Sequence, residues 1–157
     1  MKRLAEDEVY VGAKRLLRRH GAVLLGGQPP NGCDNLPVVE IKDSRRRSRG
    51  SAGAYKPDLV ALVFGMLMII ECKPARSQPD IDKLLGILDD PTRADTLFEE
   101  LEARRLMARH AIEIGKVEFR RILCAGIAYP MALQREDRLF VIGVDDSQGT
   151  GRILEPL

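Results

Sequence analysis

Hydrophobic and polar positions follow a helical spacing in three parts of the chain. Between residues 4 and 19, apolar residues recur among charged ones, and Gly21 follows. This pattern predicts an amphipathic helix that the glycine ends. Ser77 caps a second predicted helix with one apolar face, which ends before Pro91 because a residue that precedes proline avoids the α conformation. Apolar positions between residues 97 and 112 predict a third, longer helix that ends near Gly115.

Shorter apolar runs predict strands at residues 22–25, 36–41, 122–129 and 139–144, with a loop rich in proline, glycine and asparagine at residues 28–35. Two further runs, 59–64 and 66–70, are separated by a single glycine and favour a buried hairpin. Helices and strands in this order predict an α/β protein with a mixed central sheet flanked by helices. At 157 residues, the chain is expected to form a single domain spanning residues 1–157.

The hairpin determines which charged residues face each other where its strands leave the core. If Phe64 and Gly65 form a two-residue turn, Asp58 lies opposite Glu71. If the turn is formed by Gly65 and Met66, Asp58 lies opposite Lys73. Because side chains alternate along a strand, both registers place Asp58, Glu71 and Lys73 on one face and Cys72 on the other.

Two carboxylates in facing positions have Cβ atoms about 5 Å apart and repel each other. Either one of them takes up a proton or a cation lies between them. Mg²⁺, and Mn²⁺ as a substitute, prefers oxygen ligands and needs only one or two carboxylates besides water and phosphate. Phosphodiester hydrolysis requires a metal ion and a neighbouring positive charge. Asp58, Glu71 and Lys73 supply these groups, whereas an exposed salt bridge at a sheet edge is the alternative interpretation.

Pro57-Asp58, twelve intervening residues and then Glu71-Cys72-Lys73 resemble the PD-(D/E)XK nuclease superfamily, which includes restriction endonucleases and archaeal Holliday junction resolvases. The resemblance implies a restriction endonuclease-like core, formed by a helix, a three-stranded meander, a helix and a further strand. It also implies that Asp58 and Glu71 bind the metal and that Lys73 orients the attacking water.

Many members of this superfamily carry a further glutamate on the first helix that assists the metal. Glu8 is the first choice for this role and Glu6 the second. Some members add a glutamine and a tyrosine on the helix after the lysine. Gln78 is present here, but position 82 is Asp82, which sets this chain apart from those subfamilies.

The net charge of +2 does not by itself indicate a nucleic-acid partner, but the basic residues are unevenly distributed. Residues 43–54 contain no apolar side chain larger than alanine and predict a mobile basic loop. By default such a loop is a solvated turn. Its position one strand away from the carboxylates suits contact with DNA phosphates. The predicted phosphate contacts are Arg45, Arg46, Arg47, Arg49, Lys56 and Arg76.

Composition excludes several classes of protein. Tryptophan is absent and aromatic residues make up only 4% of the chain, which disfavours a single-strand binder that works by base stacking. The longest apolar run, residues 59–70, is too short to span a bilayer. Cys33, Cys72 and Cys124 lack the spacing of a zinc site or a disulfide framework, and they favour a reducing, cytoplasmic location.

Together these features predict a divalent-metal-dependent endonuclease that acts on DNA, either restriction-like or in repair. A Holliday junction resolvase is the alternative within the enzymes. A non-catalytic nucleic-acid-binding or assembly module of the same fold is the alternative from another class. Because a domain with one site reaches only one strand, cutting both strands would require a homodimer or a larger partner.

Overall fold

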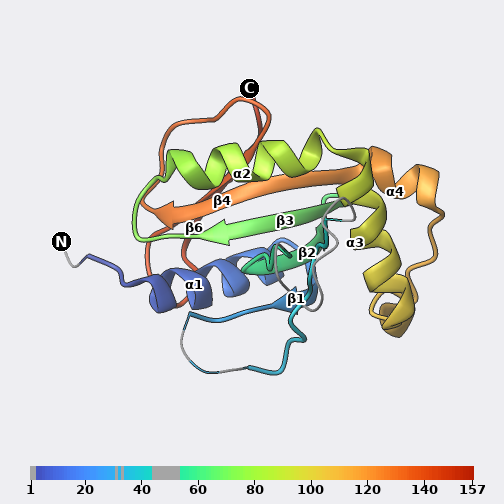
Figure 1. Ribbon diagram of the computed structural model, residues 1–157. Coiled ribbons are helices and arrows are strands. Elements are labelled where there is room, and N and C mark those ends of the chain that lie inside the picture. Colours follow the sequence, from blue (N-terminus) through green and yellow to red (C-terminus); the bar gives the residue numbers. More distant parts are fainter. Residues whose placement is uncertain (1–2, 31, 33, 44–53) are drawn as a thin grey trace.

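A computed structural model describes residues 3–30, 32, 34–43 and 54–157, and it contains a six-strand mixed sheet packed against four helices (Figure 1). The strands follow one another in the sheet in the same order as in the chain. They are β1 (Val23–Gly27), β2 (Leu59–Val63), β3 (Met66–Cys72), β4 (Leu123–Pro130), β5 (Phe140–Val144) and β6 (Gly151–Leu154). The helices are α1 (Glu6–Arg19), α2 (Gln78–Leu88), α3 (Pro91–Ala103) and α4 (Lys116–Ile122). The predicted α/β class and the mixed sheet flanked by helices are confirmed.

Strands β1, β2 and β3 form an antiparallel meander, and the turn between β2 and β3 sets its register. Val63 pairs with Met66, and the pairing continues to Leu59 opposite Ile70. The two turn residues, Phe64 and Gly65, have φ angles of 56° and 70°. Positive φ at both positions is the geometry of the tight turn whose twist matches that of a β-hairpin. The first of the two predicted registers is therefore confirmed.

The chain returns from β3 to β4 through α2, α3 and α4, and β4 then lies parallel to β3. Strand β5 is parallel to β4, and β6 is antiparallel to β5. In Figure 1, the carboxyl ends of β3 and β4 point to the left, where α1 and α2 both begin. One end of the sheet therefore brings together two strand ends and two helix amino-termini.

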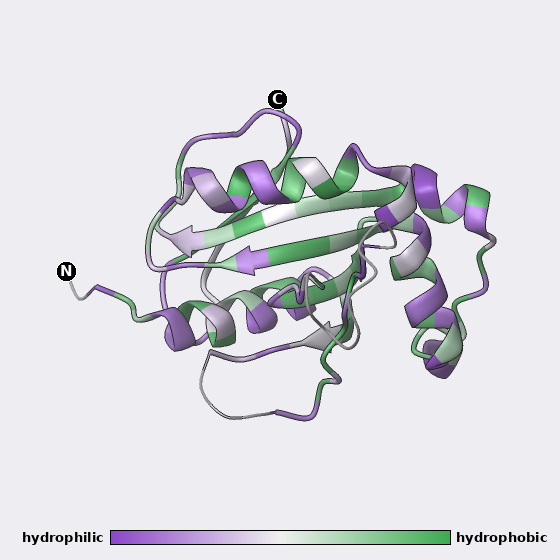
Figure 2. Cartoon of the chain, in the orientation of Figure 1, coloured by the Kyte–Doolittle hydropathy of each residue, from purple (hydrophilic) through white to green (hydrophobic). Residues whose placement is uncertain are grey.

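The sheet separates two hydrophobic cores, because neighbouring residues of a strand point to opposite faces. Leu59 packs on the side of α1, and Val60 packs on the side of α2, α3 and α4. We call these two sides the α1-side core and the α2-side core. Figure 2 shows β3 as hydrophobic along most of its length and hydrophilic near its carboxyl end. The charged residues of β3 therefore lie where the strand leaves the core.

The helix boundaries follow from capping groups that the sequence already suggests. Gly21, after α1, has a φ of 80°, which the absence of a Cβ permits. The Ser77 hydroxyl accepts a hydrogen bond from the amide of Asp80 at 3.4 Å, and α2 begins directly after Ser77. Pro91 is the first residue of α3, so the predicted end of the second helix before this proline is also confirmed.

The strand predicted at residues 36–41 is wrong, because this segment joins no ladder of the sheet. Only Ile41 forms an isolated bridge, with Tyr55. Val39 and Ile41 are nevertheless buried in the α2-side core. A neighbouring backbone group contacts α3, because the Glu40 amide donates to a Glu100 carboxylate oxygen at 3.0 Å. The apolar alternation thus reflects burial under α3, not pairing in the sheet.

The third predicted helix is also wrong in its extent. Helix α3 ends at Ala103, and Arg105 has a φ of 58°, which turns the chain back. Leu106 and Met107 then enter the α2-side core from a loop, and a short 3-10 helix, η1 (Ala108–His110), follows. Helix α4 and strand β6 were not predicted. No helix in the described part of the chain is long and apolar enough to cross a membrane.

Candidate functional site

The open end of the β2–β3 hairpin brings two carboxyl groups together. Asp58 directly precedes β2, and because Leu59 pairs with Ile70, Asp58 lies opposite Glu71. The Asp58 carboxyl group lies close enough to Glu71 to affect its pKa. Asp58 Oδ2 also accepts the backbone N–H of Cys72 at 2.8 Å, which fixes the orientation of its carboxyl group. Cys72 itself points into the α1-side core, as predicted.

The environment of Glu71 favours its protonated form. The Glu71 side chain is only 5% exposed. Burial, together with the hydrogen bond and the charge of Asp58, raises the pKa of Glu71 to about 8, although Tyr55 and Lys83 act in the opposite direction. Without a cation, these surroundings therefore favour the protonated form of Glu71. A close pair of carboxyl groups is stabilised either by a proton or by a cation, and the proton is the first of these.

Lys73 follows Glu71 on the same face and lies where β3 leaves the sheet. Its backbone N–H donates to the carbonyl of Ala128 at 2.9 Å, which extends the pairing with β4. Its Nζ lies 3.3 Å from Glu6 Oε1 and 4.0 Å from Asp80 Oδ2. Burial works to lower the pKa of Lys73, but Asp80 and Glu6 outweigh it and the pKa is raised. The lysine is therefore a stable positive charge beside the carboxyl pair.

Three residues that were not predicted complete this cluster. The Tyr55 hydroxyl donates a hydrogen bond to Glu71 Oε1. Lys83 Nζ lies 5.1 Å from the centre of the Tyr55 ring and 3.6 Å from Asp80 Oδ1. Burial and the Glu71 carboxyl raise the pKa of Tyr55 well above its ordinary value, so its hydroxyl remains a donor. A small pocket opens between Glu71, Lys73 and Asp80.

A sequence signal existed for Asp80 but not for Tyr55. Asp80 lies in the first turn of a helix that begins five residues after Lys73. Because this connection is short, Asp80 must lie near the end of the strand. Asp80 is 8% exposed. Tyr55 reaches Glu71 from a segment that belongs to no strand of the sheet. Its position depends on the bridge between Tyr55 and Ile41, which no periodicity records.

Of the two predicted glutamates, Glu6 and not Glu8 lies next to Lys73. Glu8 Oε1 accepts the backbone N–H of Ala5 at 3.1 Å and so closes the first turn of α1. Glu6, two residues earlier in α1, forms the ion pair with Lys73. The first choice from the sequence thus serves as a helix cap in the structure, and the second choice reaches the site.

The structure describes only two of the six residues that are predicted to contact phosphates. Arg45, Arg46, Arg47 and Arg49 lie outside the described residues. Lys56 Nζ lies 3.7 Å from Glu40 Oε1. The Arg76 guanidinium is paired with the Glu136 carboxylate and also donates to Gln78 Oε1 at 2.9 Å. Both described basic residues therefore already have acidic partners.

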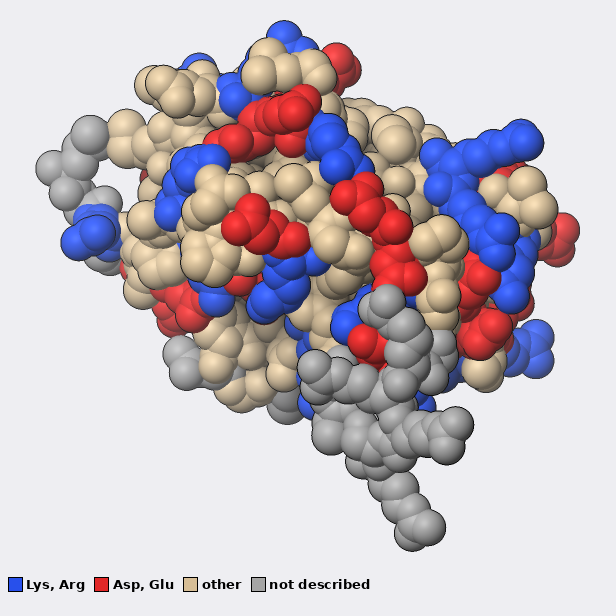
Figure 3. Space-filling model, turned by 45° about the horizontal axis from the view of Figure 1, so that its top comes forward, with Lys and Arg blue, Asp and Glu red and all other residues tan. Residues whose placement is uncertain are grey.

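Two further observations bear on nucleic-acid contacts around the site. The Gln78 side-chain amide donates to Asp82 Oδ1 at 2.9 Å and so remains on the exposed surface of α2. Acidic and basic side chains are interspersed over the face shown in Figure 3, where the described residues form no broad patch of a single sign. A nucleic acid on this face would meet charges of both signs and not a uniformly basic surface.

The carboxyl pair suits a hydrated cation better than a cage built by the protein. Among the residues that the structure describes, no three His, Cys, Asp or Glu side chains lie close enough together to hold a metal ion. Mg²⁺ keeps several waters and is commonly held by one or two carboxylates together with substrate phosphate. Asp58 and Glu71 meet that smaller requirement. A Zn²⁺ site, which takes three or four protein ligands, does not fit.

Comparisons of the chain with protein-family models, with curated proteins and with solved structures found no match. The side chains of the cluster are therefore the basis for any functional conclusion.

Proposed function

We propose that this protein is a divalent-metal-dependent endonuclease that hydrolyses DNA phosphodiester bonds, with Mg²⁺ or Mn²⁺ as its cofactor. One observation carries the proposal, namely the contact between the Asp58 and Glu71 carboxyl groups beside Lys73 at the open end of the hairpin. A largely buried pair of carboxyl groups needs a proton or a cation to be stable, so a fold that keeps such a pair indicates a use for it.

The described contacts suit each residue to a definite role. When bound, a divalent ion would polarise the phosphate and acidify a water molecule. Asp58, held by the Cys72 amide, and Glu71 would hold the ion. Lys73 would orient the water or offset the charge that develops on the phosphate. The amino-termini of α1 and α2, which lie at this end of the sheet, favour a negatively charged substrate.

The order of elements supports a restriction endonuclease-like core. Helix α1 precedes the meander β1–β3, and α2 precedes β4, which lies parallel to β3. This is the order that the resemblance to PD-(D/E)XK nucleases implies. One site of this kind serves one strand, so cleavage of a duplex would require a second copy of the chain. Preference for a four-way junction over linear duplex would identify a junction resolvase instead.

A specific observation favours a second candidate from another class. Glu6, the glutamate that reaches the site, is paired with Lys73, and the described residues offer no third carboxylate close enough to complete a metal site. A non-catalytic nucleic-acid-binding or assembly module could keep the same fold with a protonated carboxyl pair. Calorimetry separates the two candidates, because only a working site binds Mg²⁺ or Mn²⁺ in a manner that depends on Asp58.

A plasmid-nicking assay tests the proposal directly. Wild type is compared with Asp58→Asn and Lys73→Ala, in Mg²⁺ and with a chelator. Asparagine keeps an acceptor for the Cys72 amide, so loss of activity would report lost charge and not a broken hairpin. We expect each substitution to reduce the rate by about 100-fold or more, and the chelator to abolish it.

Asp95→Asn is the matched control for this assay. It removes a carboxylate of the same kind from the surface of α3, far from the hairpin end, and should leave the rate unchanged. Equal nicking by wild type, Asp58→Asn and Lys73→Ala, or nicking that persists in chelator, would refute the proposed activity.

A further inference from the structure

Tyr55 is held rigidly at the edge of the carboxyl pair. Its backbone forms two hydrogen bonds with Ile41, from the Ile41 amide to the Tyr55 carbonyl at 2.7 Å and from the Tyr55 amide to the Ile41 carbonyl at 2.9 Å. Its side chain is 9% exposed and packs in the α2-side core. The backbone bridge and the buried ring together leave the hydroxyl little freedom to move.

The hydroxyl is directed at one of the two oxygens of Glu71. It donates to Oε1 of Glu71, whose carboxyl group also contacts Asp58. An ionised carboxylate accepts several hydrogen bonds, so this donation leaves acceptor capacity for a cation. The contact therefore restricts the rotation of the carboxyl group without filling all its positions.

Charged residues of α2 contact the ring of Tyr55. Lys83 lies against the Tyr55 ring and is paired with Asp80, and Asp80 in turn lies near Lys73. One set of contacts thus connects the tyrosine that holds Glu71 with the lysine that follows Glu71 by two residues. A tyrosine needed only for core packing would require neither its hydroxyl nor this connection.

We propose that Tyr55 is a positioning residue for the metal-binding carboxylate, and that its hydroxyl holds Glu71 in the orientation in which Glu71 and Asp58 can bind one divalent cation. This inference rests on the proposed function. Hydrogen-bond partners of ligand side chains commonly contribute 10–100-fold to metal affinity, because they limit the orientations that a ligand samples.

The chain contains a matched comparison residue. Tyr10 is 1% exposed, and its hydroxyl donates to Asp34 Oδ2 at 2.7 Å. Asp34 also accepts from Lys14 Nζ at 2.8 Å and from the Leu36 amide at 3.0 Å, and it lies in the loop before Leu36. Tyr10→Phe and Tyr55→Phe therefore each remove one buried hydroxyl that donates to a carboxylate. Only one of these carboxylates belongs to the proposed metal site.

The test measures Mn²⁺ binding by the electron paramagnetic resonance signal of free Mn²⁺, and the Mn²⁺ dependence of plasmid nicking. For Tyr55→Phe we expect affinity for Mn²⁺ to fall about tenfold or more, with a smaller change in the rate at saturating Mn²⁺. Tyr10→Phe should bind Mn²⁺ within about twofold of wild type. Urea denaturation of both variants confirms that each is folded under the assay conditions.

The outcomes separate the two proposals. Wild-type affinity in folded Tyr55→Phe overturns the positioning role and leaves the proposed nuclease intact. An equal loss of affinity in Tyr10→Phe and Tyr55→Phe also overturns it, because the effect would then follow from general destabilisation. If wild type binds no Mn²⁺ in an Asp58-dependent manner, the proposed function and the positioning role both fail.

Discussion

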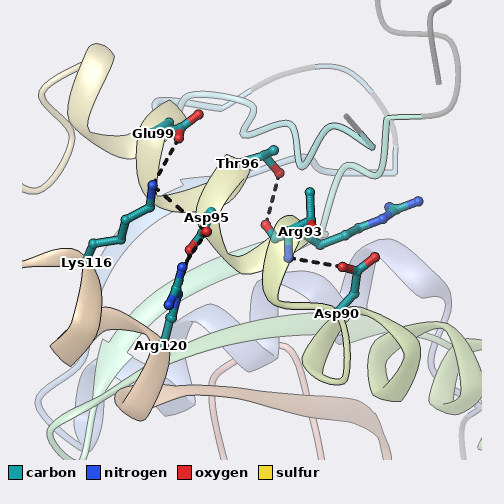
Figure 4. A network of polar contacts seen from close by, with 8 residues as sticks. Asp90, Arg93, Asp95, Thr96, Glu99, Lys116 and Arg120 are labelled. Atoms are coloured by element: carbon teal, nitrogen blue, oxygen red, sulfur yellow. Dashed lines mark hydrogen bonds and ion pairs between the residues drawn. The ribbon is translucent and has the colours of Figure 1, made fainter. Parts of the chain in front are cut away.

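The junction of α3 and α4 and the open end of the β2–β3 hairpin both gather carboxylates, but they hold them differently. At the junction, Asp95 lies 2.6 Å from Arg120 Nη2, and Lys116 Nζ lies 3.3 Å from Glu99 Oε1 and 3.9 Å from Asp95 Oδ2 (Figure 4). Acidic residues come from α3 and basic residues from α4. The hydrogen bond from Arg120 lowers the pKa of Asp95, so this carboxylate stays ionised.

At the hairpin end two carboxyl groups face each other, and their hydrogen-bond donors, the Tyr55 hydroxyl and the Cys72 amide, are uncharged. Glu71 is buried, faces Asp58 and has a raised pKa, whereas Asp95 faces cations and has a lowered one. The paired charges of the junction require nothing further to be stable. The carboxyl pair needs a proton or a cation, and this difference distinguishes a structural ion-pair network from a candidate site.

The largest expected effect is on metal affinity as pH changes. Glu71 must lose its proton to bind a cation, and its pKa without metal is about 8. The affinity for Mn²⁺ should therefore rise with pH by up to about tenfold per pH unit between pH 6 and 8, and level off above. Calorimetry across this range measures it, with Asp95→Asn expected to show the same profile. If the affinity of wild type for Mn²⁺ did not change with pH, the hairpin end would not differ from the α3–α4 junction in the protonation of its carboxyl groups.

The next effect is on stability without metal. The folded pKa of Glu71 lies above its ordinary value of 4.5, so its contribution to stability is fully present below pH 4.5 and is lost as the pH rises through 8. Glu71→Gln removes this titration. The free energy of unfolding of wild type, relative to Glu71→Gln, should fall by a few kcal/mol between pH 5 and 9. Urea denaturation at both pH values measures it, and a constant difference would contradict the raised pKa.

The smallest effect concerns the junction. Exposed ion pairs contribute little and are screened by salt. Asp95→Asn should therefore lower the urea midpoint slightly at low ionic strength and not at about 1 M salt, where the screening length is only about 3 Å. A large loss that persists in high salt would show that the junction network is more than a set of surface ion pairs.

Local rules predicted the centre of the site. A two-residue turn around Gly65 was sufficient to predict that Asp58, Glu71 and Lys73 share one face, but it left two registers open. The pairing of Leu59 with Ile70 decides between them and places Asp58 opposite Glu71. Residues 36–41 show where local rules failed. Apolar residues do alternate in this segment, because Val39 and Ile41 are buried in the core that includes α3. An alternating pattern shows that side chains are buried, but it does not show whether a sheet or a helix buries them.

The same limit applies to the helices and to the outer members of the cluster. Capping by Ser77 and the break at Pro91 are properties of neighbouring residues, so both were predictable. The end of α3 was not, because it depends on Leu106 and Met107 turning into a core built by distant strands. Glu6 was ranked behind Glu8 because helix periodicity does not reveal which glutamate faces Lys73.

The sequence by itself determined the α/β class, the hairpin, and the face shared by Asp58, Glu71 and Lys73, whereas the structure decided between the two possible registers. These features follow from alternation along a strand and from a two-residue turn, which act over a few residues. Only the tertiary structure decided that Tyr55, Glu6 and Asp80 surround that face. Their contacts with Glu71 and Lys73 depend on how the segment before β2 and the first turns of α1 and α2 pack against the end of the sheet.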